Sequence, residues 1–213
     1  MIFVGDVHGK FNRFFDIVDS TNDDVVQLGD FGLGFNSEVD KRIAGQMKQR
    51  ENVTFIRGNH DNVDVCRQTP GFLGDGLYFK EHDLFAIGGA WSIDKEYRKP
   101  NVNWWETEEL EDEEFQKAFD VYMQTKPRIM LTHDCPKAVS KRMFFDSGLL
   151  ASHFNYPSHM LQQYENRTAR WLDKFFKYHQ PELWFFGHWH IDSEMVMEGT
   201  QFRCLAELST FSL

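Results

Sequence analysis

Five short apolar runs in this 213-residue chain each lead into a polar block that contains Asp, Asn or His. In chain order the blocks are Gly5-Asp6-Val7-His8-Gly9, Gly29-Asp30, Gly58-Asn59-His60-Asp61, Thr132-His133-Asp134 and Gly187-His188-Trp189-His190. In an open α/β sheet, ligands bind just beyond the carboxyl ends of the strands. If the apolar runs are strands, the five blocks meet at such an edge, and distant segments of the chain build one polar site.

The blocks offer the donor atoms that divalent metal ions use. Seven side chains carry carboxylate, amide or imidazole groups and no thiolate: Asp6, His8, Asp30, Asn59, His133, His188 and His190. Such a mixed set suits a pair of hard-to-borderline divalent ions. The alternative is that these residues only cap strands and fill turns, which explains any single block but not five in succession. The pattern favours a site that cleaves phosphoesters.

The periodicity of apolar residues predicts an α/β fold. Between the first three blocks, apolar side chains recur at three- and four-residue steps, so we expect helices near residues 10–20 and 37–50. A spacing of about 30 residues with a crossover helix is what parallel strands require. Later elements are expected as helices near 107–124 and 159–179, strands at 77–79, 84–88, 129–132 and 183–186, and a closing hairpin that turns at Gly199. No linker or repeat divides the chain, so residues 1–213 should form one domain.

The blocks resemble the motifs of the calcineurin-like metallophosphoesterase superfamily, which read G-D-x-H-G, G-D, G-N-H-[DE], a His-containing strand end and G-H-x-H. The resemblance covers residues 2 to 190. It implies two packed mixed β-sheets flanked by helices. The segment from Gly88 to Lys95, with Arg98 and Trp104-Trp105-Glu106, looks similar to a compact bacterial and bacteriophage subgroup.

By this resemblance, each ligand has a role at a binuclear centre. Asp30 bridges the two ions, and a hydroxide shared between them attacks phosphorus. The first ion would be bound by Asp6, His8 and His190, and the second by Asn59, His133 and His188. Mn²⁺ is the expected metal, with Fe, Zn²⁺ and Ni²⁺ as alternatives. His60 would act as general acid or as a donor to the phosphoryl oxygen.

The chain departs from its relatives at the residue that orients this histidine. Several branches place an acidic residue or His three positions after the bridging Asp, whereas this chain has Leu33. The sequence offers Asp61, Asp94 and Glu106 as replacements and does not select among them. It also lacks the Arg that follows the second block in protein Ser/Thr phosphatases, so that activity is the disfavoured alternative.

The segment after residue 90 contributes candidate substrate contacts. Its tryptophans would stack on a base and its cations would bind a phosphate. We expect Arg98 and Asp94 to contact the substrate. In the alternative interpretation, Trp91, Trp104 and Trp105 cover one end of the core and the cations are solvated. The acidic residues at 106–114 are expected to be the solvated start of a helix.

Composition limits the partners. A net charge of −10 argues against binding of long nucleic acid, so we expect a small phosphorylated substrate, a nucleotide or a nucleic-acid end. No apolar run reaches the roughly 18 residues that a membrane helix needs. Three cysteines without metal-type spacing suggest a reducing, cytoplasmic location. A non-catalytic scaffold on the same fold is the alternative from another class, although such proteins usually lose ligands that this chain retains.

Overall fold

A computed structural model describes residues 1–150 and 166–213, and its strands form two mixed sheets. The smaller sheet has the order β10-β1-β2-β3, with strands Thr210–Ser212 (β10), Ile2–Val4 (β1), Val25–Gln27 (β2) and Val53–Phe55 (β3). The larger has the order β4-β5-β6-β7-β9-β8, with strands Leu77–Phe79 (β4), Leu84–Ile87 (β5), Ile129–Thr132 (β6), Leu183–Phe186 (β7), Thr200–Cys204 (β9) and Ser193–Met197 (β8). The α/β prediction with two mixed sheets is confirmed.

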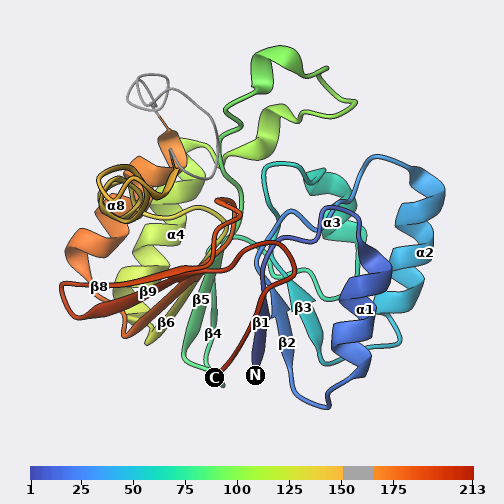
Figure 1. The fold of residues 1–213 in the computed structure, drawn as a ribbon, viewed down its shortest axis with the longest axis horizontal. Helices are drawn as coiled ribbons and strands as arrows, with labels where there is room; N and C mark the ends of the chain where they lie inside the picture. Colours follow the sequence, from blue (N-terminus) through green and yellow to red (C-terminus); the bar gives the residue numbers. More distant parts are fainter. Residues whose placement is uncertain (151–165) are drawn as a thin grey trace.

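The sheets pack against each other, and helices cover their outer faces (Figure 1). The helices beside the smaller sheet are Phe11–Asp19 (α1), Ser37–Met47 (α2) and Val63–Gln68 (α3). Those beside the larger sheet are Asp112–Thr125 (α4), Lys137–Ser140 (α5), the π-helix Lys141–Phe145 (η3) and Arg167–Tyr178 (α8). Between the sheets lies an apolar layer that includes Phe3, Leu131 and Phe185. Apolar packing on both faces fixes the strand ends that build the site.

The crossover prediction holds for the first three blocks. β1, β2 and β3 are parallel neighbours, joined through α1 and α2. The apolar side chains that recur at three- and four-residue steps along α1 are buried: Phe11, Phe14, Phe15 and Val18. The predicted hairpin that turns at Gly199 is present as β8 and β9. The short α3 and the strand β10, which pairs antiparallel with β1, were not predicted.

Two boundaries differ from the prediction. Helix α4 begins at Asp112 because Glu111 and Glu114 form a capping box there, and residues Glu106–Glu108 form a separate 3₁₀ turn (η2). Helix α8 begins at Arg167, after the N-cap Asn166. Leu161 and Tyr164, expected inside a helix from 159, lie outside the described residues. No helix among the described residues is long and apolar enough to span a membrane. The single-domain organisation stays a prediction.

Candidate metal centre

The seven predicted ligands follow the carboxyl ends of strands from both sheets. Asp6 and His8 come after β1, Asp30 after β2 and Asn59 after β3. The larger sheet adds His133 after β6, with His188 and His190 after β7. Figure 1 shows these strand ends facing away from the edge at which both chain termini lie. The sequence prediction that distant blocks converge is therefore met by the fold.

Four ligands form one compact group. The donor atoms of Asp6, His8, Asp30 and His190 all lie within 4.8 Å of one another. His190 Nε2 is 3.0 Å from Asp6 Oδ2 and 2.9 Å from His8 Nε2. Two ring nitrogens and a carboxylate oxygen that converge in this way can share one cation.

The remaining three ligands meet at the amide oxygen of Asn59. His133 Nε2 and His188 Nδ1 each lie 3.1 Å from Asn59 Oδ1. Asp30 lies between this group and the first, because its Oδ2 is 3.4 Å from His133 Nε2 and 3.8 Å from His8 Nε2. That position is the one a bridging carboxylate would need.

The backbone is strained where it presents these ligands. Four of them have positive φ angles: His8 at 47°, Asp30 at 53°, His188 at 66° and His190 at 52°. Such angles in residues other than glycine cost free energy and cluster at functional sites. Neighbouring glycines make the room, since a Cβ at Gly58 would collide with Asp30 Oδ1 and one at Gly187 with Asp6 Oδ1. Gly58 and Gly187 therefore hold space for carboxylates.

One buried oxygen tests whether a metal ion fits. Within the described residues Asp6 Oδ2 accepts no hydrogen bond, although Asp6 is fully buried. Leaving such an acceptor unsatisfied costs about 1–3 kcal/mol. Burial opposes ionisation of Asp6, but the imidazoles of His190 and His8 outweigh it and hold its pKa below the usual range. An ionised, buried oxygen to which no hydrogen bond is assigned within residues 1–150 and 166–213, beside the converging ring nitrogens of His190 and His8, fits a divalent cation.

The second group is also prepared for a cation. His133 Nδ1 lies 2.8 Å from the Leu28 carbonyl, a bond that directs Nε2 toward the site. Burial lowers the basicity of His133, yet the Asp30 carboxylate prevails and raises its pKa to about 10. Burial lowers the pKa of His188 to about 4, which leaves its ring neutral and available as a ligand. The pKa of Asp30 lies well below its usual range, because its histidine neighbours overcome burial.

The ring of His60 contacts the guanidinium of Arg98. Arg98 Nη1 lies 2.6 Å from His60 Nδ1 and Nη2 lies 3.3 Å from Nε2. Asp94 holds the guanidinium through bonds of 2.6 and 2.7 Å. Burial lowers the pKa of His60, Asp30 raises it, and the Arg98 charge lowers it further, so the net shift is downward. Since a guanidinium only donates, the shorter contact uses the Nδ1 lone pair and leaves the proton of the neutral ring on Nε2.

The three acids offered as partners of His60 lie elsewhere. Asp61 accepts backbone N–H bonds from Phe31, Gly32, Leu33 and Gly58, so it ties the second block to the third. Glu106 lies exposed in η2, and Asp94 reaches His60 only through Arg98. Among the described residues, neither Asp61 nor Glu106 is hydrogen-bonded to the His60 ring. Of the three acids that the sequence offered, Asp94 is linked to the His60 ring, and the link runs through Arg98.

Two supporting carboxylates escaped the sequence interpretation. Glu108, placed in a solvated acidic run, is 3% exposed and binds Ser92, which in turn binds Asn59. Asp134 accepts from the Trp189 indole at 3.0 Å and from the Asn166 amide at 2.6 Å, which links the two histidine-bearing loops to α8. A carboxylate directly after a ligand histidine was a signal for Asp134. No sequence signal pointed to Glu108.

The tryptophans divide between packing and support. Trp189 stacks on Phe144 with ring centroids 4.5 Å apart, so its role is packing. Trp105 is buried and donates its indole N–H to the His60 carbonyl at 3.1 Å. It therefore both covers the core and steadies the His60 loop.

Comparison with known proteins decides the family. The family described as calcineurin-like phosphoesterase matches residues 1–192. This chain belongs to the calcineurin-like phosphoesterase family. A solved structure, that of phosphopantetheinyl hydrolase from Mycobacterium tuberculosis, shares its fold, with a TM-score of 0.52 over 97% of this chain and 89% of that chain at 13% sequence identity. No curated protein sequence gives a significant match.

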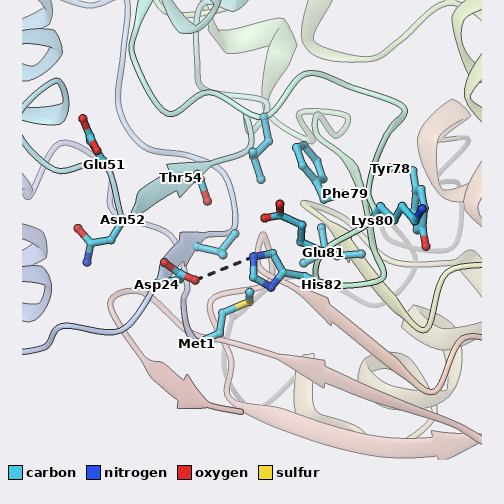
Figure 2. Close-up of a pocket in the computed structure, with 13 residues that line it drawn as sticks. Met1, Asp24, Glu51, Asn52, Thr54, Tyr78, Phe79, Lys80, Glu81 and His82 are labelled. Carbon is cyan, nitrogen blue, oxygen red and sulfur yellow. Dashed lines mark ion pairs between the residues drawn. The ribbon is translucent and has the colours of Figure 1, made fainter.

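Membership makes the chain a phosphoesterase-family hydrolase with a candidate Asp/His metal site. A separate cavity of about 580 Å³ lies at the opposite, amino ends of the strands (Figure 2). Its rim includes Asp24 and His82, whose Oδ2 and Nε2 atoms lie 3.9 Å apart. None of the predicted phosphoesterase ligands lines this cavity.

Proposed function

We propose that this chain is a binuclear metal-dependent phosphoesterase. The observation that carries the proposal is the position of Asp30, whose Oδ2 lies between His8 of the first group and His133 of the second. In this arrangement Asp6, His8 and His190 would hold one ion, Asn59, His133 and His188 would hold the other, and Asp30 would contact both. Two divalent ions, of which Mn²⁺ is our first choice, would polarise the phosphoryl oxygens and supply the nucleophile.

The protein's own side chains would orient the ester. His60 Nε2, 3.8 Å from Asp30 Oδ2, faces the centre and would donate to the phosphoryl oxygen or the leaving group. Arg98 would direct that nitrogen inward and add positive charge where a phosphate enters. Asp94 keeps the guanidinium in place. This arrangement favours phosphomonoesters, whose alkoxide leaving groups benefit most from a proton donor.

The substrate we propose is a small phosphorylated compound, most simply a nucleotide or a nucleic-acid end. Exposed apolar side chains on the segment around Arg98 support it: Tyr97 is 87% exposed and Val102 is 59% exposed. A net charge of −10 disfavours long nucleic acid. A protein Ser/Thr phosphatase remains the second candidate, with Arg98 in place of the missing arginine of the second block.

A substrate panel tests the proposal. Purified protein loaded with Mn²⁺ is assayed against nucleotides, cyclic nucleotides, sugar phosphates, short oligonucleotides, phosphopeptides and a phosphopantetheinyl ester. Turnover of nucleotide monoesters above the other classes is the expected result. A preference for phosphopeptides or for the phosphopantetheinyl ester would overturn the substrate class, and stabilisation by Mn²⁺ without turnover of any ester would favour a scaffold.

A further inference from the structure

Ser92 and Glu108 form a buried pair behind Asn59. They stand near the two ends of the segment that joins β5 to α4, and they are 2% and 3% exposed. The Ser92 hydroxyl donates to Glu108 Oε2 at 2.5 Å, and the Ser92 N–H donates to Oε1 at 3.2 Å. Both carboxylate oxygens thus hold one serine.

Arg57 connects this pair to the Gly58-Asn59-His60-Asp61 block. Arg57, 1% exposed, donates through Nη1 to the carbonyls of Thr107 at 3.0 Å and Glu108 at 2.8 Å. Its Nε donates to Asp75 at 2.8 Å. Because Arg57 directly precedes Gly58 and Asn59, the backbone of Glu108 is fixed relative to the Asn59 loop.

The direction of the hydrogen bonds then determines the orientation of Asn59. Asn59 Nδ2 can only donate, and it lies 2.9 Å from Ser92 Oγ. Ser92 has one hydroxyl proton, which goes to Glu108 Oε2, since a carboxylate only accepts. The chain of donors therefore runs from Asn59 through Ser92 to Glu108, and Asn59 Oδ1 faces His133 and His188 at 3.1 Å.

We propose that Glu108, acting through Ser92, is a positioning residue that locks the Asn59 amide with its oxygen toward the metal centre. An amide is nearly symmetric in shape, so a half-turn would present an NH₂ group, which cannot bind a cation. With Glu108 in place, that half-turn breaks the Asn59–Ser92 bond and draws the Ser92 proton away from the carboxylate. This inference rests on the proposed function, because it assigns Asn59 Oδ1 as a ligand.

Metal titration of the full chain tests it. Mn²⁺ binding is measured by isothermal titration calorimetry on protein freed of metal by chelator, for wild type, Ser92→Ala, Glu108→Ala and the conservative Ser92→Thr. Outer-shell partners of ligands typically contribute about 10–100-fold in affinity. We expect Ser92→Ala and Glu108→Ala to weaken one of two Mn²⁺ sites by about that factor, and Ser92→Thr to retain wild-type affinity.

Two comparisons separate positioning from a structural role. Ser140→Ala removes another buried hydroxyl, bonded to the Lys137 carbonyl away from this pair, and should leave both affinities unchanged. In an Asn59→Asp background either orientation presents an oxygen, so Ser92→Ala should cost less than about threefold, against about 10–100-fold with Asn59. In the Ser92→Ala/Glu108→Ala double variant, the loss of Mn²⁺ affinity should be smaller than the two single losses combined, because Glu108 acts through Ser92.

The outcomes distinguish this inference from the proposed function. If wild type binds Mn²⁺ and the Ser92→Ala and Glu108→Ala variants bind it equally well, the positioning role is overturned and the metal centre stands. The positioning role is also overturned if Ser92→Ala costs as much affinity in the Asn59→Asp background as it does with Asn59 in place. If wild type binds no Mn²⁺, both proposals are overturned.

Discussion

His8 Nε2 and His190 Nε2 lie 2.9 Å apart, although 182 residues separate them in the sequence. Two imidazole nitrogens at this distance repel each other unless a proton or a cation lies between them. The same His190 nitrogen is 3.0 Å from Asp6 Oδ2, an oxygen that accepts no hydrogen bond in the described part of the chain. The pair therefore places cation-binding atoms where β1 and β7 end.

Asp30→Asn should abolish Mn²⁺-dependent hydrolysis while the protein stays folded. The amide of Asn keeps an oxygen that can accept the backbone N–H of His60, which is bonded to Asp30 Oδ1 at 2.8 Å. It loses the negative charge that lies between His8 and His133. Outer-shell losses alone cost about 10–100-fold in metal affinity, so removal of the bridging charge should cost at least about 100-fold. Calorimetry and circular dichroism measure binding and folding. Asp24→Asn, an exposed change at the far cavity, is the control, and equal Mn²⁺ affinity in both variants would contradict the bridge.

His60→Ala should slow hydrolysis according to the leaving group. A positioned histidine contributes about 10²–10⁴ in rate through proton transfer, which alkyl esters need and activated aryl esters do not. We expect a loss in kcat/KM of that size on an alkyl phosphate and, on an aryl phosphate, less than about tenfold. His82→Ala, at the cavity opposite the site, should change neither rate. Equal losses on both esters would mean that His60 does not donate the proton.

Gly58→Ala should damage both the metal centre and the fold. An added Cβ would lie 2.0 Å from Asp30 Oδ1 and 2.2 Å from the Asp30 backbone nitrogen, so the carboxylate and the backbone that carries it must both shift. The matched change Gly45→Ala, in α2, meets no atom within 4 Å and should raise stability by about 0.5–1 kcal/mol. Mn²⁺ titration and thermal unfolding of both variants provide the check, and unchanged Mn²⁺ affinity in Gly58→Ala would exclude the space-holding role.

Asp134→Asn should destabilise the protein by about 1–3 kcal/mol, because it leaves a buried group unsatisfied. The Asp134 carboxylate accepts hydrogen bonds from the Trp189 indole, the Asn166 amide and the Cys135 backbone N–H. The NH₂ group of an asparagine at position 134 would face one or more of these donors and could not accept from them. Urea denaturation without metal measures the change. Asp16→Asn, on the exposed side of α1, should stay within about 0.5 kcal/mol of wild type. A similarly small effect at Asp134 would rule out the linking role.

Metal-free protein should lose stability as the pH rises from 7 to 10. The pKa of His133 is raised to about 10 in the folded state by Asp30, against 6.5 when unfolded. A raised histidine pKa stabilises the fold fully below pH 6.5, and this contribution is lost as pH rises through about 10. Thermal unfolding in chelator across this range should show the decline, and His133→Gln should flatten it. A wild-type profile as flat as that of His133→Gln would contradict the shift.

The sequence by itself determined the candidate ligands and the first three parallel strands with the crossover helices α1 and α2. Asp6, Asp30 and Asn59 close consecutive apolar runs, and parallel strands with crossover helices bring such ends together wherever the helices pack. Local patterns sufficed there because each βαβ unit is encoded in about 30 adjacent residues. The helix α4 was predicted from its local pattern, but its start lies at Asp112 and not near 107, because a capping box joins Glu111 and Glu114 there.

Only the tertiary structure decided what surrounds the ligands. Arg98 reaches His60, and Glu108 reaches Ser92, through side-chain contacts between segments whose spacing follows no period. Strand β10 was missed because its pairing with β1 depends on where the chain returns, which no local pattern records. Burial made the largest difference: Glu108 looks like a solvated charge in sequence and becomes a positioning group because packing around Arg57 removes it from water. Periodicity records which face of an element is apolar, but not which distant polar groups the packing encloses.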